Sequence, residues 1–131
     1  MTGFASPTLS KRERIVSRKL IELLFSKGSS RTISAFPLRI VFMEKSREEN
    51  EEPVQILVSV SKRHFKRAVK RNRVKRQIRE TYRHHKTILA EKVADDKSLA
   101  IAFIWQADEL YDSQRVERCV ERLLGKVAEC I

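Results

Sequence analysis

The chain has 131 residues, of which 41% are hydrophobic, and its formal net charge is +11. The length suits one domain, and the composition excludes a wholly disordered chain. It has neither an apolar run of the roughly 20 residues that cross a bilayer nor the apolar core of a secretory signal, which favours a cytoplasmic protein. We expect residues 1–8 to form a flexible tail and residues 9–131 a single domain.

The first predicted element is a helix over residues 9–27, because apolar residues recur there at helical spacing and Gly28 provides a stop. Its start is open, since Ser10 and Ser17 are equally good N-caps. The residues that follow, 28–32, predict a turn region.

Two strands are predicted on either side of a charged loop. Alternating apolar residues predict a strand over 36–43, and a β-branched stretch predicts another over 54–60. Residues 44–53 are rich in Glu, Lys and Arg, which is typical of a solvated loop. Because neighbouring strands joined by a loop are antiparallel by default, we expect these two to form a hairpin.

The second half of the domain predicts a long helix, a strand and a final helix. Residues 67–89 contain no Gly or Pro and predict one helix, whereas 98–105 are apolar nearly throughout and predict a strand covered on both faces. Asp112 or Ser113 caps the last helix. The order helix, strand, strand, helix, strand, helix indicates an α+β fold, a single-domain α/β sandwich around a small central sheet.

The two cysteines, Cys119 and Cys130, fall in the last predicted helix. Eleven residues of helix separate them by roughly 16 Å, whereas a disulfide needs Cα atoms within about 7 Å. We therefore expect two reduced thiols on the core side of the helix, as in a cytosolic protein.

The positive charge is concentrated in one segment. Between Lys62 and Lys86 lie twelve Lys or Arg residues and a single acid, Glu80, which leaves 16 basic and 16 acidic residues elsewhere. The entire excess of +11 therefore belongs to 25 residues. A block of this kind indicates a polyanionic partner.

On a helix this segment has two different sides. Val74, Ile78 and Tyr82 fall within an arc of about 80° and should face the core. A second row on the far side has the spacing i, i+4, i+7, i+11 and consists of Asn72, Arg76, Arg79 and Arg83. Arginine donates pairs of hydrogen bonds to phosphates, and like charges along a helix repel unless an anion relieves them. An ordinary solvated face mixes signs, as the last helix does, so this row favours nucleic-acid binding.

The basic segment resembles the "RNR" signature of the bacterial ribonuclease P protein family. The residues that carry the resemblance are Arg71-Asn72-Arg73-Val74-Lys75-Arg76, then Ile78-Arg79-Glu80, preceded by Val58-Ser59-Val60-Ser61-Lys62-Arg63. Upstream, Leu24-Phe25-Ser26-Lys27-Gly28 and Pro37-Leu38-Arg39-Ile40-Val41 are similar to the first helix and first strand of that family. The resemblance extends in order over residues 9–125.

The resemblance implies a fold with a left-handed βαβ crossover, although right-handed crossovers are the general rule. It implies contacts with the catalytic RNA subunit, and together with the basic segment these would be made by Arg71, Asn72, Arg73, Lys75, Arg76, Arg79, Arg83, Lys62, Arg63, Lys66, Arg67 and Lys70. It also implies a cleft for the single-stranded 5′ leader of precursor tRNA, for which the candidates are Phe25, Ile21, Arg39, Ser59 and Ser61. Ile21 and Arg39 stand where the family often has aromatic residues.

Other aromatic and histidine residues receive simpler interpretations. Phe25 is either a core residue at the end of its helix or a stacking surface for the leader. Trp105 is likewise open between the core and the surface. We expect three phenylalanines in the core, Phe36, Phe42 and Phe103. The histidines His64, His84 and His85 lack metal-ligand spacing and are expected to add modestly to the basic surface.

The sequence offers no protein nuclease centre, because paired carboxylates that could hold two metal ions are missing from the basic region. This agrees with what the resemblance implies, namely that the RNA subunit cleaves precursor tRNA with Mg²⁺ that is bound mainly by the RNA. We therefore predict no catalytic and no metal-binding residue in this chain, and neither a membrane nor DNA as a partner. Ribonuclease P RNA and precursor tRNA are the expected partners.

Three alternatives were weighed against this interpretation. A ribosomal or ribosome-assembly protein would share the size and charge but would not need a cleft for single strands. A DNA-binding regulator would need short polar side chains between the arginines of its recognition helix, and these are scarce here. A self-sufficient nuclease would need the missing cluster of acids.

Overall fold

The computed structural model describes residues 11–26, 28 and 30–131, so the expected tail over 1–8 lies outside the described residues. The elements in chain order are η1 (Lys11–Glu13), α1 (Arg18–Phe25), β2 (Arg31–Ala35), β3 (Leu38–Ser46), β4 (Val54–Ser59), α2 (Ala68–His85), α3 (Thr87–Ala90), β5 (Lys97–Trp105) and α4 (Ser113–Cys130). Among the described residues, no helix has the length and apolar character needed to cross a membrane.

One four-stranded sheet, with the strand order β2-β3-β5-β4, forms the centre of the fold. β3 pairs with β5 in the antiparallel sense, and β4 pairs with β5 in the parallel sense. A hairpin was predicted between the strands over 36–43 and 54–60, which correspond to β3 and β4. This prediction is wrong, because β5 lies between β3 and β4. The physical reason is that β5 is apolar on both faces and needs the central position.

The connection from β4 to β5 runs through α2 and α3, so the βαβ crossover expected from the resemblance is present. The left hand of that crossover stays a prediction. The crossover matters for function because the basic segment, residues 62–86, lies in it, in the turn after β4 and in α2.

β2 is a strand that the sequence analysis did not predict. It occupies part of the expected turn region and pairs with β3 in the antiparallel sense, with Ile33 opposite Ile40. The two strands are joined by Phe36 and Pro37, whose peptide bond is cis, so β3 begins at Leu38 rather than at residue 36. β2 is short, polar and at the edge, and only its pairing with β3 makes it a strand.

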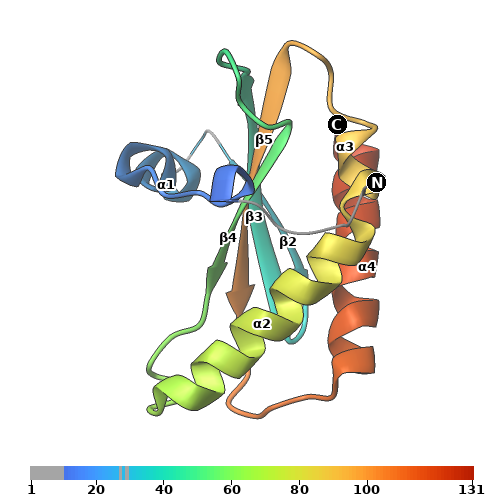
Figure 1. The fold of residues 1–131 in the computed structure, drawn as a ribbon. Coiled ribbons are helices and arrows are strands. Elements are labelled where there is room, and N and C mark those ends of the chain that lie inside the picture. The colour runs from blue at the N-terminus through green and yellow to red at the C-terminus, as the bar shows by residue number, and fades with distance from the viewer. Residues whose placement is uncertain (1–10, 27, 29) are drawn as a thin grey trace.

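The helices cover both faces of the sheet (Figure 1). α1 lies on one face, whereas α2, α3 and α4 lie on the other. The larger core fills the space under α2 and α4 and includes Tyr82, Phe103 and Trp105, each no more than 1% exposed. A smaller core under α1 contains Leu24 and Val41. Burial on both faces of β5 is confirmed.

The first helix is shorter than predicted. After η1, the backbone of Arg14 makes a β-bridge with Ile56, and the Ile15 amide donates to the Ile56 carbonyl at 2.8 Å. α1 begins only at Arg18, where the Ser17 hydroxyl accepts a hydrogen bond from the Leu20 amide. Ile15 is buried against the sheet, and this contact extends the chain where helical spacing alone predicted a helix.

The last helix begins as predicted, with the Asp112 carboxylate accepting from the Arg115 amide at 2.8 Å. Both cysteines are free thiols. Cys119 packs against the larger core, where burial raises its pKa, and its thiol donates to the Ala35 carbonyl. Cys130 is exposed, so the expectation of a core-side position is wrong for this residue, because it is the last residue of the helix and lies beyond the packed stretch.

Candidate nucleic-acid interface

α2 has the two sides that its sequence predicted. Val74 and Ile78 are fully buried, and Tyr82 is 1% exposed. Burial also raises the pKa of the Tyr82 phenol. On the opposite side Asn72 and Arg76 are exposed. Three apolar residues are therefore enough to dock the helix and leave its basic side in solvent.

A compact turn leads into α2 and carries further cations. The Ser61 hydroxyl accepts from the Arg63 amide at 3.0 Å, and the Phe65 ring is buried. His64 Nδ1 lies 2.7 Å from Asp108 of the loop before α4, which ties the turn to the body of the protein. Exposed cations on this turn and on the first turn of α2 are Lys62, Arg63, Lys66, Arg67 and Lys70.

Arg71 has a structural role in this arrangement. Its Nη1 donates to the carbonyls of Phe65 and Lys66, both at 2.8 Å, and the side chain is half-buried. The guanidinium thus closes the turn against the helix. The side chain of Arg73, by contrast, is exposed. Contact with RNA stays a prediction for both residues.

The C-terminal half of the predicted row is less free than the sequence suggested. Arg79 is half-buried, and burial followed by the proximity of the Arg14 guanidinium lowers its pKa. Arg14 lies outside every motif of the sequence and reaches this place through its bridge to Ile56. Two like charges from separate elements therefore lie close together at this point of the surface.

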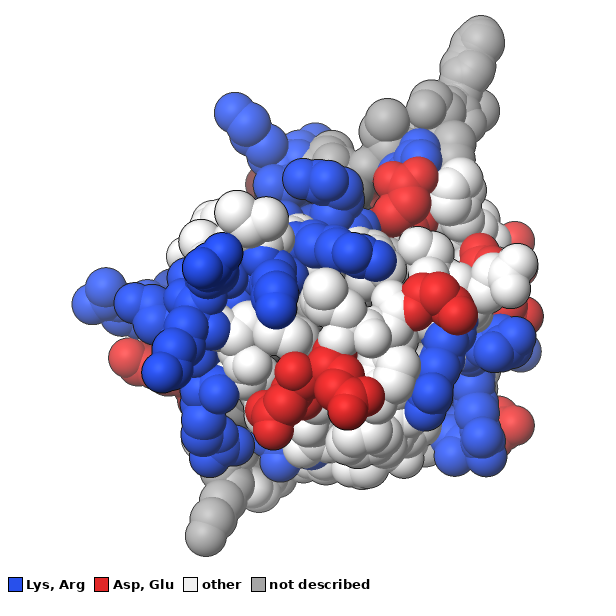
Figure 2. All heavy atoms as spheres, turned by 90° about the horizontal axis from the view of Figure 1, so that it is seen from below, with Lys and Arg blue, Asp and Glu red and all other residues white. Residues whose placement is uncertain are grey.

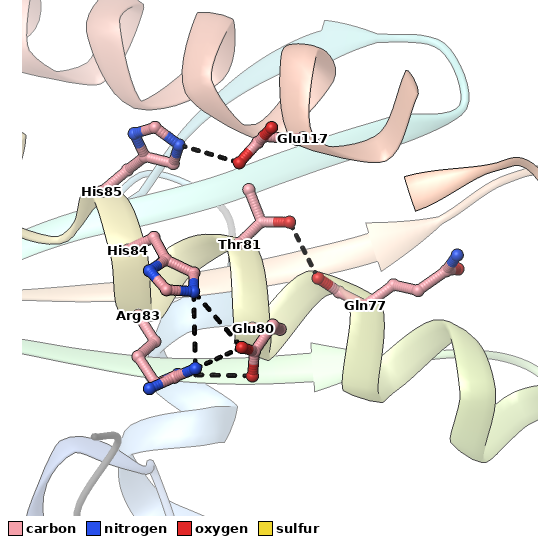
Figure 3. Close-up of polar contacts among 7 residues, drawn as sticks. All are labelled: Gln77, Glu80, Thr81, Arg83, His84, His85 and Glu117. Carbon is pink, nitrogen blue, oxygen red and sulfur yellow. Dashed lines mark hydrogen bonds and ion pairs between the residues drawn. The ribbon is translucent and has the colours of Figure 1, made fainter. Parts of the chain in front are cut away.

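Glu80, the single acid of α2, neutralises the end of the row (Figure 3). It forms an ion pair with Arg83 and lies 3.2 Å from His84 Nε2. The Arg83 hydrogen bond is the main reason why the pKa of Glu80 is lowered, and His84 contributes in the same direction. Across the next turn, His85 Nε2 lies 3.4 Å from Glu117 of α4. The strongest positive field is therefore at the N-terminal half of α2.

Figure 2 views this end of the molecule from below. Lys and Arg side chains gather on its left and upper sides, and the acidic side chains form smaller separate groups. Exposed cations occur both in the turn before α2 and in the first half of the helix. A phosphate backbone is the natural ligand of such a surface.

A second feature lies on the sheet face that α1 only partly covers. A cavity of about 460 Å³ lies beside the end of α1 and is lined by Phe25, Arg39 and Val41 among others. Phe25 is 46% exposed, so it is not a core residue. Arg39 Nε is buried and has no hydrogen-bond partner among the described residues.

The other candidates for the cleft lie elsewhere. Ser59 shares a row of the sheet with Arg39, because both residues are register partners of Ile104. Ile21 is half-buried and packs on the smaller core under α1. Ser61 lies beyond the end of β4, in the turn that precedes α2. The structure therefore brings Phe25 and Arg39 together, places Ser59 along the same face, and separates Ser61 from them.

Two expectations about aromatic residues are settled by burial. Trp105 belongs to the core, as do Phe42 and Phe103. Phe36 is 63% exposed, so the prediction that it is a core residue is wrong. Its position in the turn between β2 and β3 places the ring beyond the last paired residues of the sheet.

Among the described residues, no group of three His, Cys, Asp or Glu side chains is arranged to hold a metal ion.

Comparison with known proteins agrees with this arrangement. Relatives named ribonuclease P protein component occur in Porphyromonas gingivalis, 41% identical over 98% of this chain and 92% of the relative, and in Chlorobaculum tepidum, 34% identical over 76% and 68%. Two solved structures have a similar fold. One is an RNase P protein mutant from Staphylococcus aureus, described as defective in mRNA degradation activity, with a TM-score of 0.69 and 22% identity over 91% of this chain and 90% of that chain. The other is the RNase P protein of Thermotoga maritima, with a TM-score of 0.65 and 21% identity over 87% of this chain and 96% of that chain. The family model Ribonuclease P matches residues 9–128, and this chain therefore belongs to the ribonuclease P protein family.

Proposed function

We propose that the chain is the protein component of ribonuclease P and binds the catalytic RNA of that enzyme through α2 and the turn before it. The observation that carries this proposal is the location of the net charge. All of the excess of +11 lies between Lys62 and Lys86, and most of these cations are exposed. Neutralising phosphates there would release condensed counterions and relieve the repulsion along the helix.

The sheet face beside α1 would bind the single-stranded 5′ leader of precursor tRNA. In support, Phe25 offers an exposed ring on which a base can stack, and Arg39 offers an unpartnered donor in the same cavity. Stacking on an aromatic ring contributes about 1–3 kcal/mol per base. Since Ile21 is aliphatic, the leader contact of this chain would depend on one ring and one guanidinium.

The protein would act by binding and positioning, and the RNA would carry out the metal-assisted hydrolysis. In this proposal Mg²⁺ is bound mainly by the RNA subunit, as the resemblance to the family implies. The contribution of this chain would be to reduce repulsion between RNA segments and to favour precursor over mature tRNA.

Reconstitution tests the proposal. The full chain is mixed with a bacterial ribonuclease P RNA at low Mg²⁺, and cleavage of precursor tRNA at the mature 5′ end is followed. The variant Arg73→Ala/Arg76→Ala removes two exposed cations of α2, and Lys92→Ala/Lys97→Ala removes two exposed cations outside α2. We expect the wild type and the second variant to restore cleavage, and the first variant to lose most of it.

The salt dependence of RNA binding gives an independent readout. The α2 variant should lower the salt slope by about 1.4–1.8, which corresponds to two phosphate contacts at roughly 0.7–0.9 each. If the wild type binds RNA but leaves cleavage unchanged, the chain is a general RNA-binding protein and the proposal is wrong.

A further inference from the structure

α4 has a basic side that belongs to none of the sequence motifs. Its four cations recur at intervals of three, four and four residues, which places them within an arc of about 80°. Three of them are exposed and the last is half-buried; they are Arg115, Arg118, Arg122 and Lys126. A groove of about 420 Å³ runs past the last three of these cations and is also bordered by two acids, Glu121 and Glu129, of which only Glu129 lies within the arc.

The acids of α4 are otherwise sorted to its other side. Glu117 and Glu121 lie 3.4 and 3.9 Å from His85, so they face α2. The β2 edge lies on the opposite side, where the Cys119 thiol donates to Ala35. Two of the three acids of α4 therefore face α2, whereas the four cations lie on the outer side of the helix, with Glu129 among them.

The four cations make no ion pair with any residue in the part of the chain that the structure describes. Elsewhere on the surface, cations near acids do pair, as Lys45 does with Glu51 at 2.6 Å and Lys86 with Glu13 at 3.1 Å. Unpaired arginines in a row leave their planar forks free to bind an anion.

The row begins at an exposed aromatic platform. Arg115 lies over the Tyr111 ring at 4.2 Å from its centroid, and Tyr111 contacts both Trp105 and Phe36, with ring centroids 5.7 and 6.5 Å apart. Trp105 is buried and Phe36 is 63% exposed. The outermost ring is thus supported by the core from behind and open to solvent in front.

We propose that the outer side of α4 and the Phe36 ring form a second RNA-binding surface, separate from α2, which binds phosphates along the helix and a base on Phe36. Arginine forks favour phosphate, and an exposed ring favours an unpaired base, so together they fit a single-stranded RNA segment. Figure 2 shows a smaller group of Lys and Arg side chains on the right, apart from the larger group on the left. The choice of RNA as the ligand rests on the proposed function.

The first test measures binding of the full chain to ribonuclease P RNA and, separately, to precursor tRNA over a series of salt concentrations. Arg118→Ala/Arg122→Ala is compared with the control Lys92→Ala/Lys97→Ala, which changes the net charge equally. For at least one of the two RNAs, we expect the α4 variant to lower the salt slope by about 1.4–1.8 while the control leaves it unchanged.

The second test probes the ring. Phe36→Leu keeps an apolar side chain without a π face, and Phe36→Trp keeps the face. We expect the leucine variant to weaken the same RNA complex by about fivefold or more, the lower end of what base stacking contributes, and the tryptophan variant to bind like the wild type.

The outcomes separate this inference from the proposed function. If Arg73→Ala/Arg76→Ala weakens binding but the α4 and Phe36 variants match the wild type for both RNAs, the second surface does not exist and α2 alone binds RNA. If the wild type binds neither RNA, the proposed function fails. If Leu and Trp at position 36 weaken binding equally, stacking on this ring is excluded.

Discussion

α2 and α4 are helices of the same length, 18 residues, on the same face of the sheet, yet their sequences serve different ends. α2 has seven basic residues and one acid, whereas α4 has four basic residues and three acids. Five apolar residues of α4 are buried, compared with three in α2. α4 is thus held by burial, while α2 carries a row of like charges that repel one another along the helix.

The difference teaches that net charge and charge placement carry separate information. In α2 the excess is visible in the sequence, but some of its arginines are already engaged, as Arg71 and Arg83 are. In α4 the signs nearly balance, but the fold sorts them to opposite sides. Three substitutions, each compared with a control variant, would sharpen this contrast or break it.

The largest effect is expected in the core of α4. Leu123 is fully buried, and Leu123→Ala should lower the free energy of unfolding by about 3 kcal/mol, since it removes buried methyl groups and leaves a cavity. Urea unfolding followed by Trp105 fluorescence measures this loss. The adjacent exposed Arg122→Ala should stay within about 0.5 kcal/mol of the wild type. Equal losses in the two variants would contradict the assignment of α4 to the core.

A smaller effect should divide two arginines of α2. Arg71→Ala leaves two backbone carbonyls without their donor and should cost about 2 kcal/mol of stability, because hydrogen bonds from charged groups are the stronger ones. Arg73→Ala removes the same charge from an exposed position and should change stability by less than about 0.5 kcal/mol. The same unfolding assay compares them, and an unchanged Arg71→Ala would show that the turn does not depend on this contact.

The smallest effect concerns Glu80. Since its pKa is lowered in the folded state, mainly by Arg83, its ionised form contributes stability above its unfolded pKa, and this contribution is lost as the pH falls through the folded pKa. Glu80→Gln should therefore lower stability by about 0.5 kcal/mol at neutral pH, the size typical of exposed pairs. Below the folded pKa of Glu80, wild type and variant should unfold alike.

An exposed acid without such a pair provides the control. Glu49→Gln should change stability by no more than a few tenths of a kcal/mol at either pH. A difference between wild type and Glu80→Gln that persisted at acid pH would mean that the substitution acts through something other than charge.

Much of the local structure could be predicted from the sequence because its signals are local. The apolar run predicted β5, and Asp112 predicted the start of α4. The long run without Gly or Pro predicted α2, but as one helix over residues 67–89, whereas the structure ends α2 at His85 and starts α3 at Thr87. The core-facing stripe of α2 followed from helical spacing alone. β2 could not be predicted, because its five residues are mostly polar and become a strand only by pairing with β3.

The candidate site was predictable in its chemistry and less so in its geometry. Arg76 and Arg73 are exposed as expected, but the guanidinium of Arg71 is used to close a turn, which no charge pattern indicates. Phe36 was expected in the core because most phenylalanines are buried. Its exposure follows from a turn whose flanking strand was not foreseen.

The sequence by itself therefore determined that the chain is a small α+β domain with one basic helix and an RNA partner, since composition, periodicity and motif spacing are properties of neighbouring residues. Only the tertiary structure decided that β5 separates β3 from β4, that Phe25 and Arg39 share a cavity, and that two of the three acids of α4 face α2 while its cations lie on the outer side. These features depend on contacts between segments far apart in the chain. Such contacts are selected by how well whole surfaces pack, which no local pattern encodes.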